Sequence, residues 1–188
     1  MDSANTVQLD SHAVATLRYI RASMESASVL AVPGSSGIAS GAVGVLAAVV
    51  SSIPFVRPHW LIVWLVAAAI AAVAGGALLF RQAPIRRFAI ALGPSLFAGA
   101  VMTLVLWSSG NPRAIPGTWL LLYGCGLIAA STATARTIGF LGGAFVAAGL
   151  VAFVLPENLQ IAILGVGFGG LHLLFGYLTR RAGHGGES

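Results

Sequence analysis

Six stretches of the sequence contain no Asp, Glu, Lys or Arg, and they constrain the fold more than any other feature. A helix needs about 20 mainly apolar residues to cross the hydrocarbon core of a membrane, and each stretch meets that length. Because backbone N–H and C=O groups cannot stay unpaired in lipid, we expect each stretch to form a helix. The stretches are residues 26–56, 58–80, 88–112, 114–135, 137–156 and 158–179.

The composition points the same way. Of the 188 residues, 57% are apolar and 8% are charged, and the mean hydropathy is +0.92. Soluble domains are nearer about 45–50% apolar and about 25% charged. This excludes a soluble domain, a disordered chain and a nucleic-acid-binding module. We therefore predict an all-α membrane protein, a six-helix transmembrane bundle preceded by an N-terminal amphipathic interfacial helix.

Three segments are predicted along the chain. Residues 1–35 form a cytoplasmic segment, residues 36–179 the transmembrane domain and residues 180–188 a polar tail. Only residues 131–136 separate the fourth and fifth helices, so a hairpin of two spans and a re-entrant pair both stay open. The helices are expected near 36–55, 60–80, 88–108, 117–134, 137–155 and 158–179.

The N-terminal segment has the pattern of an amphipathic helix. Apolar residues recur every three or four positions from Ala13 to Ala27, while Arg18 and Arg21 lie off that face. This pattern favours a helix lying on the membrane surface with its arginines toward lipid phosphates, and packing on the end of the bundle is the alternative. A second basic segment, Arg81 to Arg87, joins the second and third spans. The arginines predicted to face lipid headgroups or a partner are Arg18, Arg21, Arg81, Arg86 and Arg87.

The arginines also set the orientation. If the N-terminus is cytoplasmic, eight of the ten basic residues fall on the cytoplasmic side, and only Arg57 and Arg113 fall outside. By the positive-inside rule, both termini are expected in the cytoplasm, which requires an even number of crossings. The predicted location is a bacterial cytoplasmic (inner) membrane, crossed several times.

Glycines at helical spacing predict close helix packing. Small residues let helix backbones approach closely in membranes, either within one chain or between copies in a homo-oligomer. The predicted packing positions are Gly37, Gly41 and Gly44 in the first helix, Gly139 and Gly143 in the fifth, and Gly165 and Gly169 in the sixth.

One titratable side chain stands out inside the spans. His172 lies eight residues before Arg180, about 12 Å inside the predicted boundary. Such a residue is a functional candidate by default, as a haem ligand, a quinone partner or a proton relay. The alternative is a neutral imidazole bonded to a backbone carbonyl or to Ser or Thr of another helix. Gly169 and Gly170 would leave room for a ligand or for a packed helix.

Other kinds of chemistry have little support in the sequence. Ser95 precedes Leu96 where an intramembrane serine protease has a second glycine, and Pro94 precedes it. Cys125 is expected to be a buried, unreactive packing residue. Without metal-ligand spacing or membrane-embedded carboxylates, we predict no catalytic residues and no metal site.

Several stretches resemble a family of small bacterial integral-membrane proteins, hypothetical proteins of acidobacterial and related genomes. The likeness is carried by residues 17–34, by the Arg-Arg-Phe at 86–88, by PGTWLLLYG from Pro116 and by GFGGLH from Gly167. The resemblance implies a six-helix topology and no particular chemistry. The family often ends in Arg-Arg-Tyr-Gly-Gly, and this chain departs from it with Ala182, Gly183 and His184 after the two arginines.

The leading functional hypothesis is a non-enzymatic membrane protein. It would act as a subunit or regulatory partner of another membrane or cytoplasmic component, in contact with membrane lipids. The second hypothesis is a passive carrier or binder of a small neutral or apolar molecule. The third is a redox subunit that holds haem or quinone near His172. The absence of charge within the spans argues against ion-coupled transport.

Overall fold

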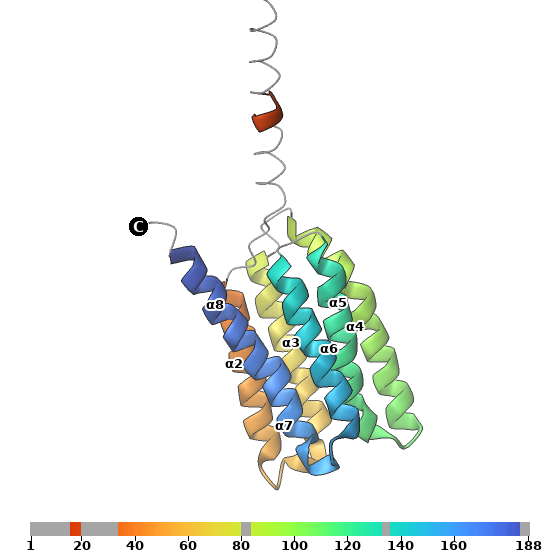
Figure 1. Ribbon diagram of the computed structural model, residues 1–188. Coiled ribbons are helices and arrows are strands. Elements are labelled where there is room, and N and C mark those ends of the chain that lie inside the picture. Colours follow the sequence, from red (N-terminus) through yellow and green to blue (C-terminus); the bar gives the residue numbers. More distant parts are fainter. Residues whose placement is uncertain (1–15, 20–33, 80–83, 133–135, 185–188) are drawn as a thin grey trace, which may run out of the picture.

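The structure is a computed structural model that describes residues 16–19, 34–79, 84–132 and 136–184. Within these ranges it is all-helical. Six helices are long and apolar enough to cross a membrane, so the chain has the character of a multi-pass membrane protein. Figure 1 shows them side by side in one bundle. The helices are α2 (Gly34–Ser52), α3 (Trp60–Leu79), α4 (Pro84–Ser108), α5 (Ile115–Ser131), α6 (Arg136–Val154), α7 (Gln160–Leu164) and α8 (His172–His184).

The six predicted helices are confirmed to within a few residues, and each is long and apolar enough to cross a membrane. α5 and α6 are both long enough to cross, which favours the hairpin of two spans over the re-entrant pair. The sixth span is α7, a π-helical segment η4 (Gly165–Leu171) and α8 in continuous order. Residues 16–19 are helical, and the remainder of the predicted interfacial helix lies outside the described residues.

Proline and glycine delimit the helices at one end of the bundle. This end carries the short 3₁₀ turns η1 (Arg57–His59), η2 (Pro112–Ala114) and η3 (Glu157–Leu159), and we call it the Arg57 end. α4 stops where Gly110 adopts a φ of +73°, a left-handed conformation that favours glycine. Pro112 then begins η2, where its missing N–H costs nothing.

The helices form two groups. α2 packs on α3 and on the last span, α7–η4–α8, while α5 packs on α4 and α6. Fewer contacts join the groups, and the largest sets of them run from α5 to α7 and from α6 to η4 and α7. The first and last spans of the chain therefore lie together on one side of the bundle (Figure 1).

Glycines hold α2 against the last span, as predicted for Gly37, Gly41, Gly44 and Gly165. A Cβ on Gly44 would lie 2.6 Å from the backbone of Phe168, and one on Gly37 would lie 3.1 Å from Cα of Gly176. Gly41 lies against Leu173, and Gly165 against Ala48. These glycines pack within one chain, where close backbone approach maximises van der Waals contact.

The glycine prediction is less accurate for α6. A Cβ on Gly142 would lie 2.7 Å from the carbonyl oxygen of Gly124 on α5, so Gly142 makes the close contact between the two helices. Gly139 lies against the Ser131 side chain near the turn. Gly143 is exposed, and no described atom lies within 4 Å of where its Cβ would be. Gly143 stands one residue off the face that contacts α5, so it makes no close helix contact among the described residues, and packing between copies stays a prediction for it.

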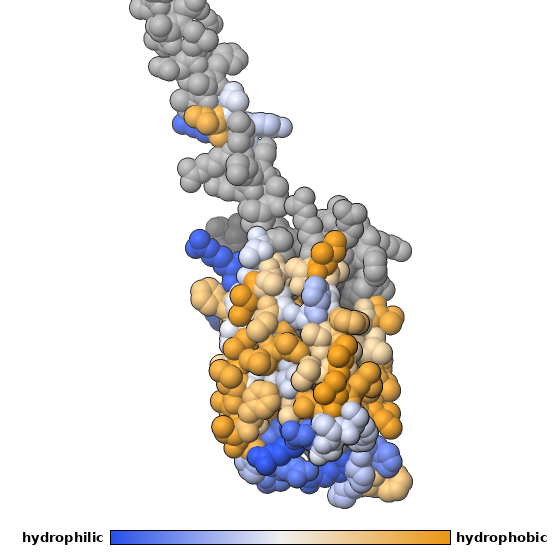
Figure 2. Space-filling model, turned by 90° about the vertical axis from the view of Figure 1, so that its right-hand side faces the viewer, coloured by the Kyte–Doolittle hydropathy of each residue, from blue (hydrophilic) through white to orange (hydrophobic). Residues whose placement is uncertain are grey.

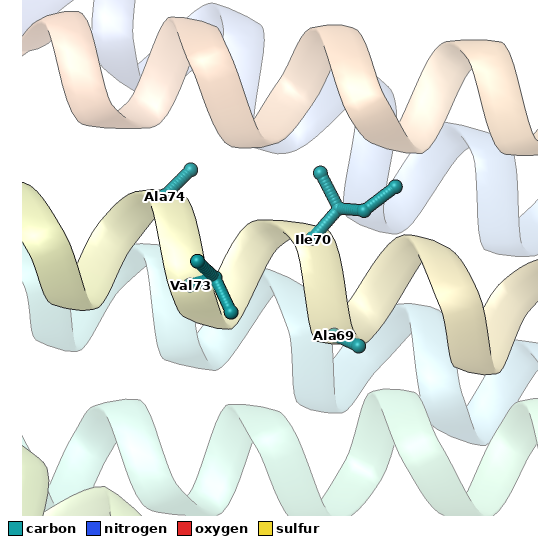
Figure 3. A pocket seen from close by; sticks show the side chains of 4 residues that line it. All are labelled: Ala69, Ile70, Val73 and Ala74. Atoms are coloured by element: carbon teal, nitrogen blue, oxygen red, sulfur yellow. The ribbon is translucent and has the colours of Figure 1, made fainter.

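The surface is banded. Figure 2 shows hydrophobic residues along the sides of the bundle and hydrophilic residues gathered at the Arg57 end. α4 is the least covered span: 6% of its apolar stretch within Phe88–Ser108 is buried, whereas 44% is buried in the span Pro112–Ser131, which contains α5. A shallow apolar hollow on α3 is lined by Ala69, Ile70, Val73 and Ala74 (Figure 3). Apolar helix surface of this kind suits contact with lipid or with another membrane helix.

Candidate functional site

His172 is buried where the two helix groups meet. It is the first residue of α8, and 8% of its surface is exposed. Its Nε2 lies 2.9 Å from the hydroxyl of Tyr123 on α5, and its Nδ1 lies 3.0 Å from the carbonyl oxygen of Phe168. Both ring nitrogens therefore have partners inside the chain.

These two contacts fix how the neutral ring is protonated. A carbonyl oxygen can only accept a hydrogen bond, so Nδ1 carries the proton and donates to Phe168. Nε2 then keeps a free electron pair, and the Tyr123 hydroxyl donates to it. The predicted bond to a backbone carbonyl is present, although the carbonyl belongs to the same span. The partner on a neighbouring helix is a tyrosine, where Ser or Thr was expected.

Aromatic rings enclose this hydrogen-bonded pair. The Phe145 ring of α6 meets His172 edge-on with centroids 5.2 Å apart, and the Phe168 ring stacks at 6.4 Å. Phe145 and Phe168 also contact Tyr123, at 4.9 and 5.2 Å. The Trp64 ring of α3 lies 6.0 Å from Phe168. The cluster joins both helix groups and leaves the pair in an apolar shell.

The π-helical segment positions one half of the cluster. η4 ends directly before His172 and contains Phe168, which gives the ring its carbonyl partner. π-helical turns occur mostly as short insertions in α-helices, frequently at functional sites. Gly167 in η4 receives the Leu120 side chain of α5, and a Cβ there would collide with it. The segment thus lets α5 approach closely enough for Tyr123 to reach His172.

The arrangement suits a structural role better than ligand binding. A haem iron or a quinone at His172 would have to displace Tyr123 from Nε2 or Phe168 from Nδ1. No group of three or more metal-ligating side chains occurs among the described residues. The sequence analysis did not predict Tyr123 as a site residue, because a tyrosine inside an apolar helix is usually interpreted as a packing residue. Its depth was a usable signal, because it precedes Ser131 by eight residues, as His172 precedes Arg180.

The glycines beside His172 face different surroundings. Gly169 packs against Val45 and Gly44 of α2, so its neighbour is another helix. Gly170 is exposed, and no described atom lies within 4 Å of where its Cβ would be. Neither glycine opens a space beside the imidazole for a ligand.

Two other sequence candidates are placed by the structure. Ser95 lies against Gly126 on α5, and the hydrogen bonds of His172 go to Tyr123 and Phe168, so the structure forms no Ser–His pair. The Cys125 thiol is exposed on α5. The expectation of a buried cysteine was wrong because Cys125 lies on the outer face of this helix.

The arginines expected to meet headgroups or a partner are described only in part. Arg18 is exposed on the helical residues 16–19. Arg21 and Arg81 lie outside the described residues. Arg86 and Arg87 belong to α4, and their side chains are outside the described part of the chain.

Arg57 and Arg113, the two arginines that the predicted orientation places outside the cytoplasm, have partners at the Arg57 end. Arg113 donates from Nη2 to the carbonyl oxygen of Leu155 at 3.2 Å, and Arg57 donates to that of Asn158 at 3.4 Å. Both carbonyls flank Pro156, in the connection between α6 and α7. These arginines therefore bind backbone carbonyls at a helix-to-helix turn.

No protein-family model, curated protein or solved structure matches this sequence. The resemblance drawn from the sequence motifs therefore stays a prediction. Inference about function rests on the residues and their geometry.

Proposed function

We propose that the protein is a non-enzymatic membrane subunit or regulatory partner within a larger assembly. The observation that carries this proposal is the hydrogen bonding of His172. The strongest candidate for chemistry inside the spans has both ring nitrogens bonded within the chain, inside an apolar shell. Catalysis or cofactor binding would begin by breaking these bonds, whereas a role in assembly leaves them intact.

The outer surface supports the same proposal. α4 has little intrachain cover, and Gly143 on α6 offers an open small residue to an approaching helix. Ala147 lies one turn further along α6 and is also exposed. A small residue at every fourth position allows close contact between membrane helices. In the proposed arrangement, lipid or a partner helix covers these faces.

The proposed recognition surfaces for a cytoplasmic or peripheral partner are basic. They are the N-terminal segment with Arg18 and Arg21, and the connection containing Arg81, Arg86 and Arg87. Both belong to the cytoplasmic side under the proposed orientation, with both termini in the cytoplasm of a bacterial inner membrane. Guanidinium groups there would pair with lipid phosphates or with carboxylates of a partner.

Crosslinking in intact membranes tests this proposal. Proteins crosslinked to the full chain would be purified in mild detergent and identified by mass spectrometry, together with co-eluting small molecules. Arg81, Arg86 and Arg87 would be changed together to Gln, and a second variant would carry Lys at the same positions. We expect a stoichiometric partner that the Gln variant loses and the Lys variant keeps.

Two results would contradict the assembly role. One is a chain that crosslinks to nothing in its native membrane. The other is a visible absorption band that disappears in His172→Gln, because that result would assign haem to His172 and support the redox hypothesis.

A further inference from the structure

The last span changes its helix type at η4. Four of the seven residues of this π-helical segment are glycine. Helices change direction sharply at prolines, at π-helical insertions or where small residues interrupt the regular backbone, and glycine gives the backbone additional freedom. η4 therefore combines two features that let one helix bend in the middle of a span.

A side chain holds the backbone where η4 ends. In an α-helix the N–H of His172 would bond the carbonyl of Phe168, four residues earlier. Here that N–H bonds the carbonyl of Gly169, and Nδ1 of the same histidine takes the Phe168 carbonyl at 3.0 Å. The imidazole is held in turn by the Tyr123 hydroxyl at 2.9 Å. The junction between η4 and α8 thus depends on a contact with α5.

Beyond this junction α8 leaves the rest of the bundle. Its contacts outside its own span are mainly with α2. Among residues 173–181, Gly176 is the only buried one, and it lies against Gly34 and Ile38 of α2. Figure 1 shows α8 leaning away from α5 and α6 toward its C-terminal end. α5 and α6 keep buried residues at the same end, among them Ala130 and Ile138.

α2 is packed so closely on α8 that the two must move together. A Cβ on Gly34 would lie 2.6 Å from the carbonyl oxygen of Gly176, so the two backbones are in contact. Further along α2, Gly44 lies against Phe168 inside η4. α2 therefore passes η4 at a glycine contact and can tilt about the same level as α8.

We propose that η4 is a hinge about which α8, with α2 packed on it, swings relative to α5 and α6. The bond between Tyr123 and His172 is the latch that holds this hinge in the position seen in the structure. The helix from His172 to Arg181 rises by about 14 Å, so a change of about 20° in direction at η4 would move Arg181 by about 5 Å. This movement belongs to the chain itself and does not depend on a partner.

Distances between pairs of spin labels test the hinge in the full chain. The exposed native thiol of Cys125 is first changed to Ala. One labelled pair, Ile90→Cys on α4 and Arg181→Cys on α8, replaces exposed residues of two helices that lie on opposite sides of the bundle in Figure 1. The control pair, Leu104→Cys on α4 and Ala162→Cys on α7, also replaces exposed residues, and it lies on the Arg57 side of η4.

Removing the latch should release α8. We expect Tyr123→Phe to widen the distribution of distances between the labels at Ile90 and Arg181 by about 5 Å, and to leave the control pair unchanged. His172→Leu removes the latch from the other helix and should give the same widening. An unchanged distribution in both variants would overturn the proposal. Equal widening of the control pair would also overturn it, because that result would show a general loosening of the bundle.

A second substitution tests whether the movement takes place at η4. Gly170 is exposed with open space where its Cβ would be, so Gly170→Ala restricts the backbone of η4 without a collision. Added to Tyr123→Phe, it should narrow the widened distribution. Gly143→Ala is the matched control, because Gly143 is an equally open glycine on α6. Widening that persists in the Gly170→Ala variant, or that Gly143→Ala suppresses equally, would refute a hinge at η4.

Discussion

Tyr123 and His172 come from different helix groups and meet at the same depth, joined by a hydrogen bond of 2.9 Å between the phenol and Nε2. The bond links α5 to the last span, and the rings of Phe145 and Phe168 pack around it. The π-helical segment before His172 gives the second partner, the Phe168 carbonyl. The pair therefore fixes how the two groups dock rather than offering an open reactive site.

We predict that Tyr123→Phe and His172→Leu each lower stability modestly. Interhelical hydrogen bonds in membranes contribute about 0.6 kcal/mol on average and rarely more than about 1.7 kcal/mol. The double variant should lose less stability than the sum of the losses of the two single variants, because both changes remove the same bond between Tyr123 and His172. Thermal unfolding in detergent measures these losses, and His172→Gln, which keeps a donor, should be the mildest change at this position. Fully additive losses would show that the bond does not stabilise the protein.

We predict that Gly44→Ala is strongly destabilising and that Gly143→Ala is not. A Cβ at Gly44 would meet the backbone of Phe168 and Gly169 at 2.6–2.7 Å, and overpacking of this kind costs about 1–3 kcal/mol. Gly143 has open space, and alanine in a helix interior gains about 0.5–1 kcal/mol over glycine. Thermal unfolding in detergent compares the stabilities of the Gly44→Ala and Gly143→Ala variants. If Gly143→Ala impairs a native complex while leaving the isolated chain stable, a partner helix contacts this face.

The sequence predicts the spans well because a run without charge must be helical in lipid, whatever its neighbours are. It predicts helix faces less well. Gly142, the neighbour of the predicted Gly143, makes the contact with α5, and no periodicity distinguishes two adjacent glycines in an apolar helix. His172 was visible because it is the one histidine deep in a predicted span. Tyr123 was not, and η4 carries no signal in its glycine-rich sequence that separates a π-helix from an α-helix.

We predict that the Arg113 side chain stabilises the connection between α6 and α7. Arg113→Ala would remove the bond to the Leu155 carbonyl, and hydrogen bonds to charged groups contribute about 1.5–3 kcal/mol at most. Arg57→Ala should cost less, because its bond to Asn158 is longer, at 3.4 Å against 3.2 Å. Thermal unfolding of the two variants shows which of them loses more stability. A larger loss for Arg57→Ala would reverse this assignment.

Accessibility of introduced cysteines tests the proposed orientation, which rests on the arginine distribution. The native thiol, Cys125, is exposed on α5, so it must first be changed to Ala. A cysteine at Asn111, at the Arg57 end next to η2, should then react in intact cells with a reagent that cannot cross the membrane. A cysteine at Ser188 should react only after the cells are opened, because the eight-to-two arginine bias places the C-terminus in the cytoplasm. Both positions become reactive after the membrane is dissolved, which controls for buried thiols. Labelling at Ser188 and protection at Asn111 in intact cells would invert the proposed orientation.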